Sequence, residues 1–207
     1  MTHPDFARAA AGITEDGLRA LLMDLVDIGS PTGKEAGVAE YLVARMRKSG
    51  METDLPLVDA ARPNAVGHRR GRGDGFNLLL TGHMDTSYSG QEEHLAGEGF
   101  QPKAVHRDGW VWGLGANNMK SGLAAALAAV EALAKAGIEL AGDISLGAVV
   151  GEIEKSAIDE FQGVEYSGYG IGTRHLVTHG VTADFAVLAE PTGMRIATAN
   201  MGVIWLR

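Results

Sequence analysis

A histidine and an aspartate stand two residues apart at the end of an apolar run. Residues 77–81 are expected to form a strand that delivers His83 and Asp85 to its end. In extended backbone, side chains two positions apart point to the same side. A metal-binding histidine needs a partner that fixes its ring, and a carboxylate is the usual one. His83 is therefore a candidate metal ligand and Asp85 its support, although such a pair alone is more often a core histidine beside a turn aspartate.

Acidic side chains follow two other apolar runs. Residues 144–150 lead to Glu152, and residues 185–188 lead to Glu190. Because ligands of α/β sheets gather outside the carboxyl ends of strands, we expect His83, Glu152 and Glu190 in one crevice. Solvated loop acids are the plainer explanation of each carboxylate taken singly.

A glycine-rich loop at residues 112–122 opens onto a helix rich in Ala and Leu, expected over residues 119–136. The loop contains Asn117 and Asn118, so polar side chains and backbone amides converge where the helix begins. Ordinary helix-capping asparagines are the alternative explanation.

The elements that must position these residues alternate between helix and strand. Apolar residues recur at helical spacing over residues 14–29 and again over about 35–50, so two helices precede any strand. Strands are expected over residues 64–68, 77–81, 144–150, 185–188 and 196–199. Strands that alternate with helices indicate an α/β layered domain.

Composition narrows the class of partner. The chain has 207 residues, 45% of them apolar, and 18 basic against 26 acidic residues give a formal charge of −8. This charge argues against nucleic acid and anionic membranes. We find neither a membrane-length apolar run nor a signal pattern, and there is no cysteine. We expect a soluble, cytoplasmic protein whose metal ligands are histidine, carboxylate or amide groups.

Two glycine runs, at residues 71–75 and 168–172, offer a nucleotide-binding alternative. Neither lies between a clear strand and a helix with the full phosphate-binding pattern. The segments 87–107 and 157–174 are expected to be long irregular loops, which are often functional.

The order of the motifs resembles that of the co-catalytic zinc peptidases and deacylases, which include acetylornithine deacetylase, succinyl-diaminopimelate desuccinylase and aminoacylase. The resemblance rests on Ser-Pro-Thr-Gly (30–33), Gly-His-x-Asp-Thr (82–86), Gly-x-Gly-Ala-x-x-Met-Lys-x-Gly (113–122), a strand ending before Glu152, and Glu-Pro-Thr (190–192). It covers nearly the whole chain and favours the metal-site interpretation of His83. It implies a mixed, twisted sheet flanked by helices.

The resemblance implies a role for each matching residue. His83 and Glu190 would bind one zinc ion, Asp85 would orient His83, and Glu152 would be the general base. The reaction would be hydrolysis of an N-acyl amino acid or a short peptide. A homodimer of the full-length protein is a further expectation.

Two positions depart from the family pattern. Asn118 stands where the family has an aspartate that bridges two metals, and an uncharged amide binds zinc more weakly. Ile153 replaces the second residue of a Glu-Glu pair, and Glu154 would substitute for the missing ligand only in extended backbone. One zinc site is therefore expected and a second is doubtful. The resemblance also implies a cis peptide between Asn118 and Met119.

The family's members are roughly twice as long, with a lid domain after the Glu-Pro-Thr strand and a final histidine ligand. We therefore expect residues 1–207 to be the N-terminal part of a catalytic domain that lacks the lid and, alone, is inactive. The apolar segment 203–207 at the end of the chain suggests the same. The alternative to a hydrolase is a non-catalytic homologue that binds an acyl-amino acid or peptide, which Asn118 and Ile153 favour.

Overall fold

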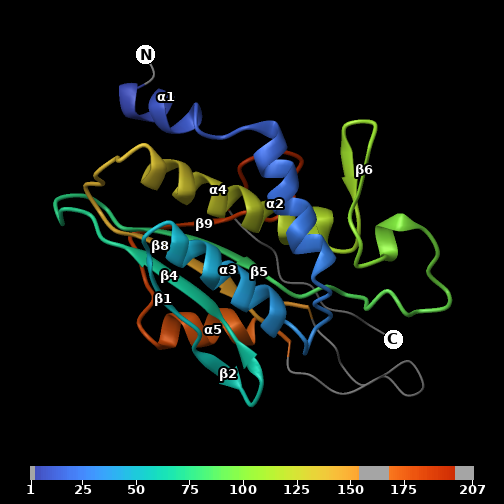
Figure 1. Cartoon of the computed structure of the whole chain (residues 1–207). Helices are drawn as coiled ribbons and strands as arrows, with labels where there is room; N and C mark the ends of the chain where they lie inside the picture. The colour runs from blue at the N-terminus through green and yellow to red at the C-terminus, as the bar shows by residue number, and fades with distance from the viewer. Residues whose placement is uncertain (1–2, 154–167, 199–207) are drawn as a thin grey trace.

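A five-stranded sheet is the middle layer of the computed structural model, which describes residues 3–153 and 168–198 (Figure 1). Its strands are β1 (Glu52–Asp54), β4 (Ala65–Arg69), β5 (Leu78–His83), β8 (Ile144–Val149) and β9 (Phe185–Leu188). The order is β1-β4-β8-β5-β9. β8, β5 and β9 run parallel, whereas β4 is antiparallel to both of its neighbours, so the sheet is mixed as expected.

Helices cover both faces of this sheet (Figure 1). The helices are α1 (Pro4–Ala10), α2 (Glu15–Asp27), α3 (Ala36–Lys48), α4 (Ser121–Lys135) and α5 (Ile171–Thr178). On one face, Leu42 of α3 and Leu127 of α4 pack against Leu146 of β8. On the other face, Leu176 of α5 packs against Val149. Alternate residues of β8 thus enter two separate clusters, which explains why the whole strand is buried.

Helix α2 begins as its sequence predicts. The hydroxyl oxygen of Thr14 accepts a hydrogen bond from the backbone N–H of Gly17, and Glu15 and Asp16 lie in the first turn, where acidic residues are favourable. The buried face of the helix contains Leu21 and Leu25 and packs toward α4.

Smaller elements complete the fold. They are the antiparallel pair β2 (Leu57–Asp59) and β3 (Arg62–Pro63), the antiparallel pair β6 (Val105–Arg107) and β7 (Trp110–Trp112), and the short turns η1 (Glu98–Phe100) and η2 (Ala116–Lys120). Turn η2 connects the glycine-rich loop to α4. In the part of the chain that the structure describes, no helix is long and apolar enough to cross a membrane.

Four of the five expected strands are present within two residues of their expected bounds, and the one at Phe185–Leu188 matches at both ends. The strand expected at 196–199 is wrong for residues 196–198, which are irregular, while residue 199 lies outside the described residues. Ile196 is 94% exposed, so its apolar side chain has no packing there that would favour a strand.

The sequence interpretation also missed several elements. Helix α1 was not expected, so three helices rather than two precede the first strand. Helix α5 overlaps a segment that was expected to be irregular. Its sequence signal is weak, because the helix has only eight residues and only two of them are buried. The strands β1, β2, β3, β6 and β7 are two or three residues long, too short to show a period-two pattern.

Candidate active site

His83 is the last residue of β5, and its imidazole is almost fully buried, with 1% of the side chain exposed. The ring nitrogen Nδ1 lies 2.9 Å from the backbone oxygen of Asp85 and 3.3 Å from its Oδ1. These contacts fix the ring and leave Nε2 facing away from Asp85. Burial lowers the pKa of His83, but hydrogen bonds to Asp85 and Glu190 outweigh burial and raise that pKa to about 10.

Asp85 connects this histidine to the end of β8. Its Oδ1 accepts the backbone N–H of Glu152 at 3.1 Å, and its Oδ2 accepts the backbone N–H of Ile153 at 2.9 Å. Burial raises the pKa of Asp85, but His83 and the two N–H groups outweigh burial and hold the pKa below its ordinary value. The carboxylate therefore stays charged and orients two parts of the site.

Three oxygens surround Nε2 of His83. Asn118 Oδ1 lies at 2.7 Å, Glu190 Oε1 at 3.3 Å and Glu152 Oε2 at 3.8 Å. The residues come from η2, from the end of β9 and from the end of β8, so three separate segments converge on the end of β5. His83, Glu152 and Glu190 thus lie close together at the carboxyl ends of the parallel strands.

Glycines allow the close approach of these segments. A Cβ on Gly82 would lie 2.3 Å from Cε of Met119, so this glycine leaves room for the side chain of Met119, the neighbour of Asn118, to pack against β5. A Cβ on Gly122 would lie 2.3 Å from the backbone oxygen of Ala189, directly before Glu190. The peptide between Asn118 and Met119 is cis, as the family resemblance implied.

Glu152 has a half-exposed side chain at the mouth of the site. Its burial, together with the negative charges of Glu190 and Asp85, raises its pKa above the ordinary value, although His83 acts in the opposite direction. The two carboxylates thus differ: Glu152 is half exposed with a raised pKa, whereas Asp85 is buried with a lowered pKa.

The spacing of these atoms bears on metal binding. Two ligands that each lie about 2.0 to 2.1 Å from a tetrahedral zinc ion are about 3.3 Å apart. The separation of 3.3 Å between His83 Nε2 and Glu190 Oε1 fits such a pair. Asn118 Oδ1 lies 2.7 Å from Nε2, closer than two ligands of one zinc ion, so it would have to move outward to bind the same ion. Glu152 Oε2 lies 3.8 Å from Nε2, farther than two ligands of one zinc ion.

A complete metal cluster is not formed by the described side chains. Among residues 3–153 and 168–198, no group of three or more His, Asp or Glu side chains is arranged to hold one metal ion. Glu154, the candidate replacement ligand of a second metal, lies outside the described residues, as does the segment 203–207. The donor set of imidazole and carboxylate fits zinc in its chemistry.

The loop between α2 and α3 holds the end of β5, a contribution that sequence reasoning missed. Thr32 Oγ1 donates to Asp85 Oδ2 at 3.0 Å, and Ser30 Oγ donates to the backbone oxygen of Met84 at 2.7 Å. The backbone N–H of Thr86 also donates to the backbone oxygen of Ser30. The available signal was the Ser-Pro-Thr-Gly motif itself, whose buried hydroxyl groups require partners.

The glycine runs that suggested nucleotide binding use backbone N–H groups within the chain. Gly71 donates to Asp143 Oδ1, and Gly73 donates to the backbone oxygen of Ala141. Gly172 donates to the backbone oxygen of Val150. Phosphate-binding loops require free N–H groups, so these contacts weigh against a phosphate cradle at either run.

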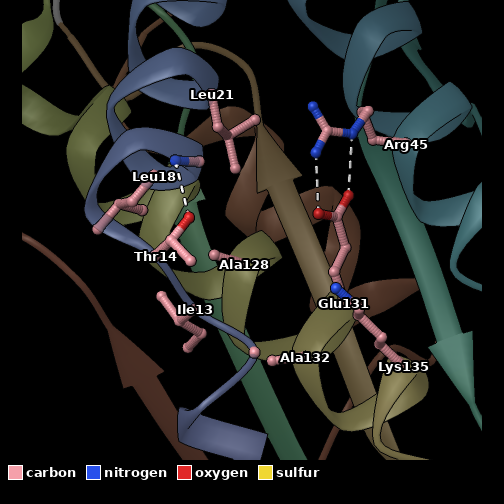
Figure 2. A pocket seen from close by; sticks show the side chains of 11 residues that line it. Ile13, Thr14, Leu18, Leu21, Arg45, Ala128, Glu131, Ala132 and Lys135 are labelled. Carbon is pink, nitrogen blue, oxygen red and sulfur yellow. Dashed lines mark hydrogen bonds and ion pairs between the residues drawn. The ribbon is translucent and has the colours of Figure 1, made fainter.

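A separate pocket of about 190 Å³ lies between the start of α2 and helices α3 and α4 (Figure 2). Ile13, Leu18 and Ala128 line it, and the ion pair of Arg45 with Glu131 closes one side. None of the four side chains gathered at the end of β5 lines this pocket.

The mixed sheet with helices on both faces places the chain among α/β proteins. Residues 79–203 match the family described as peptidase family M20/M25/M40. The chain belongs to this family.

Two relatives illustrate the similarity. The chain is 30% identical over 168 residues to N-formyl-4-amino-5-aminomethyl-2-methylpyrimidine deformylase of Bacillus subtilis, covering 80% of this chain and 36% of that protein. It is 34% identical over 175 residues to succinyl-diaminopimelate desuccinylase of Gluconacetobacter diazotrophicus, covering 83% of this chain and 42% of that protein. The chain thus spans less than half the length of these curated relatives.

Solved structures share the fold. A tripeptidase from Staphylococcus aureus superimposes with a TM-score of 0.65 at 24% identity, covering 86% of this chain and 44% of that one. Aminopeptidase PepT from Bacillus cereus gives a TM-score of 0.64 at 24% identity, covering 85% and 43%. At this identity the likeness shows the common fold alone.

Proposed function

We propose that this chain carries part of the active site of a metal-dependent hydrolase of amide bonds, with an N-acyl amino acid or a short peptide as substrate. The observation that carries the proposal is the group of oxygens around Nε2 of the buried His83, at the carboxyl ends of three parallel strands. A polar cluster of this kind, placed where α/β sheets bind ligands, has the chemistry that amide hydrolysis needs.

In this proposal, His83 and Glu190 hold one zinc ion, and Asp85 orients the imidazole. When bound, zinc supplies Lewis acidity, which polarises an amide carbonyl and makes water more acidic. Glu152 accepts the proton of the attacking water and passes it to the leaving amine nitrogen. Asn118 remains a candidate ligand of a second zinc ion, with Glu154 as its partner.

The substrate class is supported by the names of the relatives. A deformylase, a desuccinylase and a tripeptidase differ in the acyl group named, and the bond common to an N-formyl, an N-succinyl and a peptide group is an amide. The second candidate is a non-catalytic homologue that binds the same ligands, and the uncharged Asn118 beside His83 favours it. A cytoplasmic location and a homodimer remain predictions.

The test combines zinc content with turnover. The protein at its native length and the 207-residue chain are each supplied with zinc, and zinc per chain is measured by mass spectrometry. Both are assayed against N-formyl, N-acetyl and N-succinyl amino acids and tripeptides. We expect zinc binding and turnover in the native-length protein, and no turnover in the 207-residue chain alone.

Two substitutions separate the roles. H83A should abolish zinc binding, whereas E152Q should retain zinc and lower kcat by about 100-fold or more, the usual contribution of a general base. The matched control is H68A, which removes a partly buried histidine that contacts Ser145 of β8 rather than Glu190. Equal zinc content in H83A and H68A would contradict the metal site; ligand binding without turnover in the native-length protein would favour the non-catalytic homologue.

A further inference from the structure

The backbone that leads out of β8 is held by side chains from distant parts of the chain. The N–H of Val150 donates to Asn64 Oδ1 at 3.1 Å, and the N–H of Gly151 donates to Glu35 Oε1 at 3.2 Å. The next two N–H groups are those bound by Asp85. Four consecutive backbone donors therefore end on side-chain oxygens, an arrangement that fixes the direction in which the chain leaves the sheet.

Glu35 is wholly buried, and a buried carboxylate requires compensation. Arg62 supplies it through two parallel contacts, Nη2 to Oε1 at 2.7 Å and Nε to Oε2 at 3.1 Å. Arg62 is 2% exposed and also contacts Asp59 at 3.1 Å. This bidentate geometry holds the carboxylate in one orientation, with Oε1 directed at Gly151.

A buried ion pair adds little stability compared with apolar side chains of similar size, because desolvation offsets the attraction. The specific consequence of the ion pair between Glu35 and Arg62 is that it fixes the orientation of the Glu35 carboxylate. This carboxylate is an acceptor fixed beside the turn that carries Glu152. Asn64 binds the same stretch of backbone by accepting the N–H of Val150, and its own amide is held by donating to the backbone oxygen of Gly172 in α5 at 2.8 Å.

We propose that Glu35 and Arg62 are positioning residues that fix the turn after β8 and thereby place the Glu152 carboxylate beside His83. The catalytic consequence rests on the proposed function, in which Glu152 is the general base. The fixing of the turn is a property of the folded chain and is tested without any assay of turnover.

The test compares two double variants of the native-length protein. E35M/R62M removes the acceptor and both charges while keeping side chains of similar length. E35Q/R62M also removes both charges, but its amide oxygen still accepts the N–H of Gly151. The difference between the two variants isolates that hydrogen bond from the ion pair.

The matched control is the ion pair of Arg45 with Glu131, which is also bidentate, at 2.9 and 2.8 Å, and joins α3 to α4 (Figure 2). It lines the separate pocket described above and does not contact the turn after β8. R45M/E131M therefore measures the effect of losing an ion pair elsewhere in the same fold.

The first measurement is hydrogen exchange at the amide of Gly151. In the unaltered protein this amide, outside any strand, should exchange much more slowly than amides in exposed loops. Exchange should accelerate by about tenfold or more in E35M/R62M, a loss of about 1.4 kcal/mol of local protection. It should stay slow in E35Q/R62M and in R45M/E131M. Fast exchange at Gly151 in the unaltered protein overturns the proposal, and this outcome does not depend on whether E35M/R62M folds. Equal exchange at Gly151 in all three variants also overturns it.

The second measurement is turnover. We expect kcat to fall by roughly 10-fold to 100-fold in E35M/R62M, because a small misplacement of a catalytic group has effects of this order. KM and zinc content should be unchanged, and E35Q/R62M should recover most of the loss. A fall in kcat that accompanies loss of zinc, or that R45M/E131M reproduces, contradicts positioning of the base. If the unaltered protein hydrolyses no amide, the proposed function fails, and exchange at Gly151 still decides the positioning role.

Discussion

In the proposed active site, the charge at position 118 would set how strongly a metal ion is held near His83. The amide oxygen of Asn118 lies 2.7 Å from Nε2, and the amide carries no charge. Under the proposed function, a divalent cation between His83 and Glu190 would be balanced by the carboxylates of Glu190 and Glu152, whose oxygens lie 3.3 and 3.8 Å from Nε2. An added charge at this position would strengthen binding, because unit charges about 4 Å apart interact by about 1 to 4 kcal/mol, depending on the dielectric.

We predict that N118D tightens zinc binding by about tenfold or more, since about 1.4 kcal/mol corresponds to a factor of ten. The measurement is competition for zinc with a chromophoric chelator. The control is N117D, which adds the same charge at the adjacent exposed residue. Equal affinity in N118D and the unaltered protein would mean that Asn118 is not a ligand position.

At the scale of an element, the loop between α2 and α3 fastens the end of β5 to the rest of the domain. Thr32 is buried and donates to the carboxylate of Asp85, which in turn accepts two N–H groups from the turn after β8. One hydroxyl thus stabilises a charged group that links two strands. Hydrogen bonds to charged groups contribute more than neutral ones, about 1.5 to 3 kcal/mol.

T32V keeps the shape of the side chain and removes its donor. We expect the free energy of unfolding to fall by about 1.5 kcal/mol or more, measured by urea denaturation. T178V is the matched control, because the hydroxyl of Thr178 is exposed and contacts only nearby groups, the backbone oxygens of Arg174 and His175 and Nδ1 of His179, and its effect should stay within about 0.5 kcal/mol. Similar losses in both variants would show that Thr32 has no special role.

At the scale of the whole molecule, β9 is an apolar strand at the edge of the sheet. Phe185, Val187 and Leu188 are each at least half exposed, and in the described part of the chain β9 pairs with β5 alone. An exposed apolar edge strand is a template for pairing with another chain. The 207-residue chain should therefore associate with itself as its concentration rises.

We predict that V187K reduces this association, because a lysine on an edge strand opposes pairing by charge and desolvation. Sedimentation velocity over a range of concentrations measures the effect. V177K is the matched control, since Val177 lies on α5 and is exposed to the same extent as Val187, 50% in each case. Association that persists unchanged in V187K would place the contact elsewhere.

The sequence by itself determined the main strands, the order of the motifs and the residues that gather at the end of β5. These features depend on local patterns: an apolar run followed by a polar residue predicts both a strand and the site at its end, as it did for His83, Glu152 and Glu190. The strand expected at 196–199 is absent at residues 196–198, because an apolar run forms a strand only where another strand pairs with it, as β5 pairs with β9, and no described strand pairs with these residues.

Only the tertiary structure decided how the turn after β8 is held. Glu35 meets Arg62 across 27 positions of sequence and Gly151 across 116, and Asn64 meets Val150 across 86. No local period connects such residues, because their contact depends on sheet order and on the packing of α3 against the sheet. A charged residue in a helical segment is usually solvated, whereas Glu35 is buried, as is Asp85 at the active site, and burial is a property of the folded chain.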